Sequence, residues 1–517
     1  MSGYSQVYLT VNVPGAGGLF GAMTYTERTT VTDLTITGFI DARDFVTLRD
    51  QMPVLSSLDI SQADIMEYTG TAGTGGVALR TYPSGEIPYC AFWYNGGKTT
   101  LTQVILPQTA HVIGMHAFQG CTGLTQAVFP PSVDSIMYSA YHLCSGLIEI
   151  NIPSTIQYIG LDAFARCGGN IIVSADNPIY AGQDGVLFNK TFTSLIQCPN
   201  SKSGYSIPLS VDKVCMDAFI GCTMLETLLI PYSVQNIESS AFAGCTGLTE
   251  LEFPNTIHLI PYACCSGCTS LQSVIIPESI DTISDVAFSM CTSLTNINLP
   301  YSLHYIGVMT FWNCTALSSL SLPPQLSAIM PQAFRQCTSL ESLVFPPSMS
   351  SLTAGILYQC SGLKKVVLPA TITSIQSAAF FGCSSLEEFH ANNPVPVDLS
   401  AMINVFQGVP VSSSVLYVPV GSKILYETAA QWQDFENIVE DVYAGIEKPL
   451  PASIWIKISE GLLRISGLEQ GDDISVYSLT GGKIFYGNAT DEQLNIILPI
   501  RGTYILRINN NSRKIFY

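Results

Sequence analysis

Sixteen cysteines give this 517-residue chain its widest choice of chemistry, because thiols form disulfides, bind metals and act as nucleophiles. Their spacing narrows that choice. Thiols stacked at one repeat position would lie about one strand spacing apart, ~4.8 Å, which is longer than the Cβ separation that a disulfide prefers. We therefore interpret most of them as small buried apolar residues. Eleven recur every 23 residues with one interruption: Cys121, Cys144, Cys167, Cys222, Cys245, Cys268, Cys291, Cys314, Cys337, Cys360 and Cys383.

A metal centre or a catalytic histidine has little support. Cys264, Cys265 and Cys268 form a local cluster, but Cys268 belongs to the 23-residue series and Cys265 takes an aromatic repeat position, so packing explains both. The thiols outside the series have no spacing that pairs them: Cys90, Cys198 and Cys215. Three of the six histidines share a variable position four residues after a proline and belong to no catalytic motif: His111, His258 and His304.

Two further motifs lack residues that phosphate or calcium binding would need. Gly96-Gly97-Lys98-Thr99 resembles the end of a phosphate-binding loop, but Phe92 stands where that motif needs its first glycine. Asp176 and Asp184 could offer oxygen ligands to calcium, yet the D-x-D-x-D-G order is missing and a turn is the better prediction. We expect no cofactor, no metal and no catalytic residue; an enzyme site in residues 168–200 or in the C-terminal tail is the catalytic alternative.

A repeating unit must position these residues. It reads L-x-x-φ-x-φ-P-x-S-φ-x-x-I-x-x-x-A-F-x-x-C-x-x, where φ is apolar. Residues three and one before each proline alternate with variable residues, which is the period of a short strand with one buried face, and proline ends the strand. One unit cannot bury its own face, so the units must stack. The prolines are Pro107, Pro130, Pro153, Pro208, Pro231, Pro254, Pro277, Pro300, Pro323, Pro346 and Pro369.

The number of repeat units can be counted from the residues at the aromatic position of the A-F-x-x-C stretch. The register breaks once, because Cys167 to Cys222 spans 55 residues, one period of 23 plus 32. The extra segment, about 168–200, contains the turn sequences Asp176-Asn177-Pro178 and Asp184-Gly185, and predicts a hairpin-like bulge from the solenoid. Twelve copies occur, at Phe92, Phe118, Tyr141, Phe164, Phe219, Phe242, Cys265, Phe288, Phe311, Phe334, Leu357 and Phe380.

Different patterns flank the repeats. In the N-terminal region, Leu34-Thr35-Ile36 and Leu58-Asp59-Ile60 recur at 24 residues, and between them Phe45, Leu48 and Met52 fit one helical face behind Asp41 or Asp44. The C-terminal residues alternate apolar and polar around glycine turns, which predicts a small β-sandwich. The expected domains are a capping region at 1–78, repeats at 79–390, a second cap at 391–447 and the sandwich at 448–517.

The repeat resembles a known family. Leu294–Phe311 and Leu340–Cys360 are similar to the BspA-like leucine-rich repeats of Bacteroidetes-type bacteria, and Ile474–Lys483 with Arg501–Tyr504 is similar to C-terminal sorting domains of the type IX secretion class. The resemblance implies a right-handed solenoid with end caps, and exported or surface-attached proteins that adhere to host or partner-cell components. The first six residues lack a signal-peptide pattern, so the extracellular or outer-membrane location is inferred from the resemblance.

Composition excludes other classes of protein. Apolar residues make up 47% of the chain, which argues against disorder. Acidic residues outnumber basic ones 39 to 21, for a net charge of −18, so binding to nucleic acid is disfavoured. No apolar run reaches the ~18 residues that would span a bilayer. We expect a monomer without a transmembrane segment.

The candidate site is a surface. Side chains four and two residues before each proline point away from the buried face and form a ribbon of small polar and isolated aliphatic groups, suited to broad, shallow contact. Two aromatic residues in the first repeat could stack on a sugar or anchor a protein. We predict noncatalytic adhesion to host or partner-cell proteins through this ribbon, with polysaccharide capture as the alternative. The candidate residues are Trp93, Tyr94, Gln103, Ile105, Gln126, Val128, Leu229, Ile275, Asn296, Asn298, Val344 and Val367.

Overall fold

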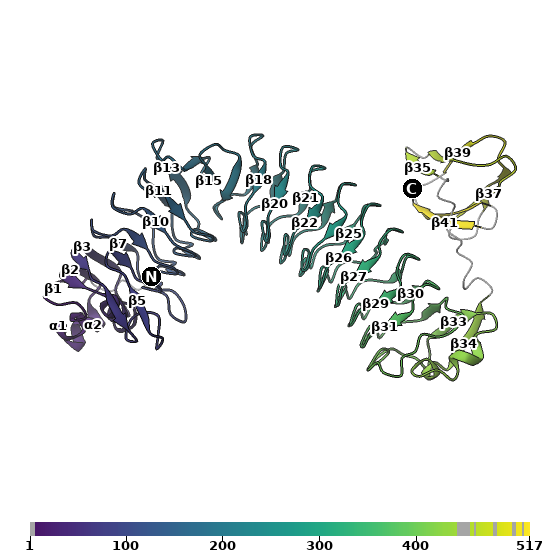
Figure 1. Ribbon diagram of the computed structural model, residues 1–517, viewed down its shortest axis with the longest axis horizontal. Coiled ribbons are helices and arrows are strands. Elements are labelled where there is room, and N and C mark those ends of the chain that lie inside the picture. Colours follow the sequence, from purple (N-terminus) through teal and green to yellow (C-terminus); the bar gives the residue numbers. More distant parts are fainter. Residues whose placement is uncertain are drawn as a thin grey trace.

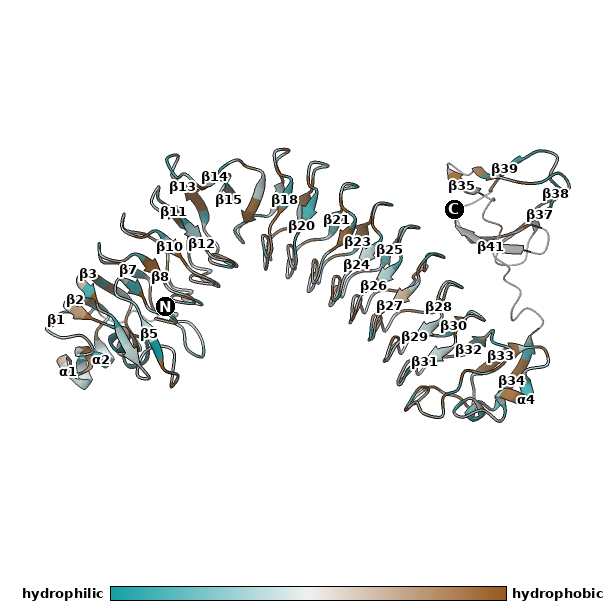
Figure 2. Ribbon diagram, viewed as in Figure 1, coloured by the Kyte–Doolittle hydropathy of each residue, from teal (hydrophilic) through white to brown (hydrophobic). Residues whose placement is uncertain are grey.

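The computed structural model describes residues 6–441, 455–459, 462–478, 483–498, 503–508 and 511–516. Over residues 6–441 the chain winds into a solenoid whose turns stack along a curved axis (Figure 1). Strands dominate and the helices are short. Hydrophobic residues recur in every turn of the stack and alternate with polar ones (Figure 2). The predicted fold class, a β-rich leucine-rich-repeat solenoid, is confirmed.

Nearly every turn contributes a first strand whose residues alternate between core and solvent; the turn at residues 317–323 forms none. In β19 (Thr227–Leu229), Leu228 is buried and both of its neighbours are exposed. Neighbouring first strands pair in parallel, residue for residue. The other first strands are β7 (Gln103–Ile105), β9 (Gln126–Ala127), β11 (Glu149–Ile152), β13 (Asn170–Val173), β17 (Gly204–Ser206), β21 (Glu250–Glu252), β23 (Ser273–Ile275), β25 (Asn296–Ile297), β28 (Ser342–Val344), β30 (Lys365–Leu368) and β32 (Glu388–Ala391).

A second, shorter strand follows each proline turn and forms a second set of parallel sheets. In most of these strands the last residue is the buried isoleucine of the repeat or its equivalent; Ile159 is half-buried, and β16 continues two residues past the equivalent position, Leu195. These strands are β6 (Glu86–Ile87), β8 (Val112–Ile113), β10 (Ser135–Ile136), β12 (Tyr158–Ile159), β16 (Ser194–Gln197), β18 (Lys213–Val214), β20 (Asn236–Ile237), β22 (Leu259–Ile260), β24 (Thr282–Ile283), β26 (Tyr305–Ile306), β27 (Ala328–Ile329), β29 (Ser351–Leu352) and β31 (Ser374–Ile375).

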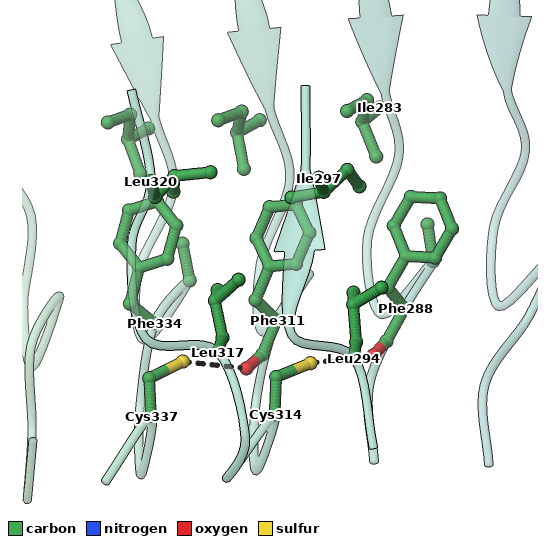
Figure 3. Packing of buried hydrophobic residues seen from close by; sticks show 14 of the residues in the cluster. Ile283, Phe288, Leu294, Ile297, Phe311, Cys314, Leu317, Leu320, Phe334 and Cys337 are labelled. Atoms are coloured by element: carbon green, nitrogen blue, oxygen red, sulfur yellow. Dashed lines mark hydrogen bonds between the residues drawn. The ribbon is translucent and has the colours of Figure 1, made fainter. Parts of the chain in front are cut away.

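Between these two strands the repeat positions build a continuous core. The rings of Phe288, Phe311 and Phe334 stack one per turn, with centroids 5.7 and 5.6 Å apart and nearly parallel planes (Figure 3). Cys314 and Cys337 are buried, as the sequence predicts. Their thiols also donate hydrogen bonds, at 3.1 and 3.2 Å, to the carbonyls of Phe288 and Phe311 in the preceding turn. The thiol is therefore a polar partner inside an apolar core.

The N-terminal cap continues the first sheet, in the order β1-β2-β3-β7. Between β2 and β3 a helix begins at Ala42 behind a capping box made by Asp41 and Asp44. Phe45 in this helix, Leu48 in the π-helix that continues it and Met52 directly after that π-helix are fully buried, as expected for one apolar face. The elements are β1 (Tyr8–Val13), α1 (Leu19–Ala22), α2 (Tyr25–Thr30), β2 (Asp33–Ile40), α3 (Ala42–Val46), the π-helix η1 (Thr47–Gln51), β3 (Ser57–Ile65), β4 (Tyr68–Gly70) and β5 (Arg80–Tyr82).

The C-terminal cap extends the same kind of sheet, in the order β28-β30-β32-β33-β34. Trp432 is buried there, and its indole N–H donates to the carbonyl of Val397 at 2.9 Å. The elements are β33 (Val415–Pro419), α4 (Lys423–Tyr426), the 3-10 helix η2 (Trp432–Asp434) and β34 (Asn437–Asp441).

The C-terminal residues form two antiparallel sheets, β35-β36-β39 and β38-β37-β40-β41, around their own apolar cluster. These strands are β35 (Trp455–Ser459), β36 (Leu462–Ser466), β37 (Asp473–Ser478), β38 (Lys483–Asn488), β39 (Gln493–Ile497), β40 (Thr503–Ile508) and β41 (Asn511–Phe516). The expected boundary between the second cap and the sandwich, at 447 and 448, lies outside the described residues. In the part of the chain that the structure describes, no helix has the length and apolarity needed to cross a bilayer.

The extra segment at 168–200 is part of the stack. A hairpin of β14 (Tyr180–Gln183) and β15 (Val186–Asn189) turns at Asp184-Gly185, both with positive φ. Strand β16 pairs with β15 on one side and with β18 of the next turn on the other. The segment therefore forms an additional rung instead of a bulge, because its apolar residues Val186, Phe188 and Leu195 are fully buried.

Candidate binding surface

The predicted ribbon is exposed where the first strands face solvent. We call it the strand face, with a first row four residues before each proline and a second row two residues before it. The polar residues Gln103, Gln126, Asn296 and Asn298 are exposed, and Val367 is half-buried. The aliphatic residues of the second row are between 43% and 67% exposed: Ile105, Val128, Leu229, Ile275 and Val344.

Strand register aligns the candidate residues within each sheet. Val344 lies opposite Val367, and Ser273 lies opposite Asn296. The rows are not continuous over the whole solenoid, because the first strands fall into separate sheets, β13-β11-β9 before the extra rung and β17-β19 and β21-β23-β25 after it. The structure thus gathers the predicted residues into several patches on one side of the coil.

The longest patch runs past the repeats into the C-terminal cap. From Val367 the second row continues through His390 and Tyr417 to Val439. The rings of His390 and Tyr417 stack with centroids 4.4 Å apart and planes 11° from parallel. These three residues were not predicted, although the strand pattern Val415-Leu416-Tyr417-Val418-Pro419 has the same proline ending as the repeats.

Charges in this patch are compensated. Lys365 Nζ lies 2.6 Å from a carboxylate oxygen of Glu388, and His390 Nε2 lies 3.2 Å from the same oxygen. The hydrogen bond from Lys365 lowers the pKa of Glu388, so this carboxylate stays ionised at neutral pH. The result is a nearly neutral strip in a chain whose net charge is −18.

The two aromatic candidates lie elsewhere. Trp93 and Tyr94 belong to the connection between β6 and β7, outside any strand. The Trp93 ring is half-buried beside His116, with centroids 5.4 Å apart. Tyr94 is 54% exposed, and the guanidinium carbon of Arg49 lies 4.9 Å from its ring centroid. These residues form a separate aromatic patch near the N-terminal cap.

The motifs with catalytic or metal-binding appearance have structural roles. Lys98 is buried, and its ammonium donates to the carbonyl of Met52 at 2.6 Å, at the end of the η1 helix. Asn177, beside Asp176, is fully buried and bonds the backbone of Pro153 and Ile156. His111, His258 and His304 are exposed, each directly before a second strand. Among the described residues no group of three or more His, Cys, Asp or Glu is placed to hold a metal ion.

The repeat geometry agrees with a family model. The description "BspA type leucine rich repeat region" matches residues 86–203, 189–318 and 309–398, which together exceed half of the chain. The chain belongs to the BspA-type leucine-rich repeat family. No curated protein matches it significantly.

Several solved structures are similar to this BspA-type chain. A leucine rich cell surface protein from Faecalibacterium prausnitzii is 26% identical, over 56% of this chain and 78% of that one, with a TM-score of 0.42. A leucine-rich repeat protein from Bacteroides ovatus is 21% identical, over 74% and 86%, with a TM-score of 0.44. The pneumococcal vaccine antigen PcpA is 17% identical, over 80% and 81%, with a TM-score of 0.37.

Proposed function

We propose that this chain is a noncatalytic binding protein that acts outside the cell or on the outer-membrane surface and adheres to proteins of host or partner cells. The observation that carries the proposal is the strand face, where isolated aliphatic side chains stand among short polar ones on rigid parallel strands. Large contacts between proteins need such mixed surfaces, with apolar groups to anchor and polar groups around them. The family resemblance, which implies exported adhesive proteins, supports the location.

A binding screen on the full chain tests this proposal. The full chain is applied to a panel of immobilised extracellular-matrix proteins and purified glycans, and saturation is measured for each. We expect saturable binding to at least one protein, weakened tenfold or more by the double substitution Leu229→Asp and Ile275→Asp, which places two carboxylates on the strand face. Leu259→Asp is the matched control, because Leu259 is 48% exposed on a second strand. Equal losses in both variants would contradict the proposal.

Polysaccharide capture is the second candidate function. It is favoured by Tyr94, whose ring rests against Arg49 while more than half of its surface stays open to solvent. Sugar rings stack on such aromatic faces, and a fixed ring loses little entropy on binding. Saturable glycan binding that is abolished by Tyr94→Ala and insensitive to the strand-face substitutions would establish this function in place of protein adhesion.

A further inference from the structure

The extra rung has an unusually short loop between its second strand and its aromatic position. Its Cys198 takes the place of the repeat phenylalanine, because Cys198 N–H bonds Ala218 O as Phe219 N–H bonds Ala241 O one turn later. Cys198 follows Leu195 by three positions, whereas Phe219 follows the equivalent Val214 by five. The loop between the second strand and the aromatic position is therefore two residues shorter in this rung.

A cavity fills the place of the missing loop. It has a volume of about 160 Å³. The preceding turn, the extra rung and the following turn all contribute walls, so the cavity lies where the three meet. Its lining includes Leu161, Asp162, Leu187, Gln197, Cys215 and Met216.

Two carboxyl groups meet beside this cavity. Asp162 and Asp217 occupy the same repeat position, two residues before the aromatic one, and both have a positive φ, 58° and 57°. Asp217 is 8% exposed, and Asp162 Oδ1 is buried without a hydrogen-bond donor. The Ser240 hydroxyl donates to Asp217, whose other hydrogen-bond partner is the Asp162 carboxyl group. Two ionised carboxylates in contact would repel one another, so a proton shared between them supplies the donor that Asp162 Oδ1 lacks.

The hydrophobic core also divides at this point. One cluster runs from the N-terminal cap to Leu187, and the other from Val186 to the C-terminal cap. Strand β15 lies between the two clusters, because Leu187 packs in the first while Val186 and Phe188 pack in the second. We call residues 6–167 the N-terminal arm and residues 198–441 the C-terminal arm; Figure 1 shows the extra rung, marked by β15, between them.

We propose that this junction is a pH-controlled hinge, in which a proton shared by Asp162 and Asp217 holds the two arms together and its loss opens the cavity between them. A change of angle here would move the strand-face patches of one arm relative to those of the other. Every other turn of the described repeats carries a residue other than Asp at this position, for example Ser139, Ser240 and Ala263. The pair is thus specific to the junction.

The surrounding charges set the direction of the response. Burial, followed by the charge of Asp162 and a hydrogen bond with it, raises the pKa of Asp217 to about 7. Burial also raises the pKa of Asp162, although Asp217 and Arg166 oppose the shift. A carboxyl pKa raised in the closed state stabilises closure at low pH, and this stabilisation is lost as pH rises from about 4 through about 7.

The other ionisable groups near the pair do not change in this range. Burial lowers the pKa of His142 to about 4, so this neighbour of Arg166 stays neutral. On the other side, Lys213 and Glu238 form an ion pair at 2.7 Å, and Glu238 accepts from the Met216 N–H. Burial raises the pKa of Cys215, which lines the cavity, to about 11.

Cys215 is a built-in reporter of opening. All sixteen cysteines lie in the described residues, and the other fifteen are buried. The rate of Cys215 alkylation is measured by peptide mass spectrometry between pH 5.5 and 8 in the full chain and in Asp217→Asn. Asparagine tolerates the positive φ and cannot ionise. The rate ratio of wild type to variant cancels the thiol's own titration, and we expect it to rise about tenfold from pH 5.5 to pH 8.

Asp281→Asn is the control, because Asp281 is exposed directly before β24 and remote from the junction. It must behave as the wild type does. A wild-type to Asp217→Asn ratio that stays constant over this range overturns the proposal. If Asp217→Asn does not fold, the infrared spectrum of the wild type decides: a carboxylic-acid C=O stretch present at pH 6 and lost by pH 8 supports the shared proton, and its absence at pH 6 overturns it.

Discussion

At the scale of single residues, the repeat cysteine does more than fill space. In ten of its eleven positions the thiol donates to a backbone carbonyl of the preceding rung, at 3.0 to 3.6 Å. Each such carbonyl belongs to the residue at the aromatic position. The 23-residue spacing predicted burial correctly, but spacing locates a side chain without showing where its donor points, so the hydrogen bond could not be foreseen.

Two substitutions at Cys314 separate the roles of volume and hydrogen bonding. Cys314→Ala leaves a small cavity and removes the donor to Phe288 O, and we expect it to lower the free energy of unfolding by about 1–2 kcal/mol. Cys314→Ser retains a donor, and we expect a smaller loss. Urea midpoints of the two variants provide the measurement. A serine variant less stable than the alanine variant would show that the thiol acts only as an apolar group.

A second hydrogen-bonding position explains the P-x-S part of the repeat. At six turns a hydroxyl two residues after the proline donates to a carbonyl of the preceding turn, as Ser279 does to Ile257 at 2.7 Å and Ser302 to Ile280 at 2.6 Å. Because the side chain bonds the rung before it, serine and threonine both serve. The two polar positions of the unit thus tie neighbouring rungs together.

At the scale of elements, the sequence predicted most rungs and missed one. The regular rungs could be predicted from the 23-residue spacing of proline and phenylalanine. The proline marks the end of the first strand, and the phenylalanine marks the opposite side of the same turn. The extra rung escaped because Cys198 replaces the phenylalanine and the loop before it is short, so both markers of the period are lost. For the same reason the strand face was predicted within the repeats, whereas His390 and Tyr417 in the cap were not.

Strand β15 offers a test of the divided core. Leu187→Ala removes contacts from the N-terminal cluster and Phe188→Ala from the C-terminal cluster, and each should cost about 2–5 kcal/mol. We expect hydrogen exchange to lose protection mainly in residues 100–167 for the first variant and mainly in residues 204–260 for the second. The two variants are controls for one another. Identical protection patterns would show that the two clusters behave as one core.

At the scale of the whole molecule, the buried thiols act together. Burial raises the pKa of Cys167, Cys314 and Cys360 to about 12, and that of Cys337 well above its ordinary value. In the unfolded chain these groups ionise near pH 8.5. Between these limits the unfolded state binds fewer protons than the folded state, so stability is retained below pH 8.5 and falls as pH rises.

Each thiol with a raised pKa contributes a loss of about 1.4 kcal/mol per pH unit above pH 8.5. Because many rungs carry such a thiol, their losses of stability at alkaline pH add up in one chain. We therefore expect the chain to unfold by about pH 10. In the triple variant Cys314→Ala, Cys337→Ala and Cys360→Ala, the free energy of unfolding should be lower at pH 7 but should decline about 4 kcal/mol less per pH unit, since three titrating groups are gone. Circular dichroism in urea from pH 7 to pH 10 measures this slope.

Leu317→Ala is the control: it removes a buried residue without a titrating group, so it should lower stability and leave the slope unchanged. A triple variant with the wild-type slope would mean that the thiols ionise in the folded protein as readily as in the unfolded one.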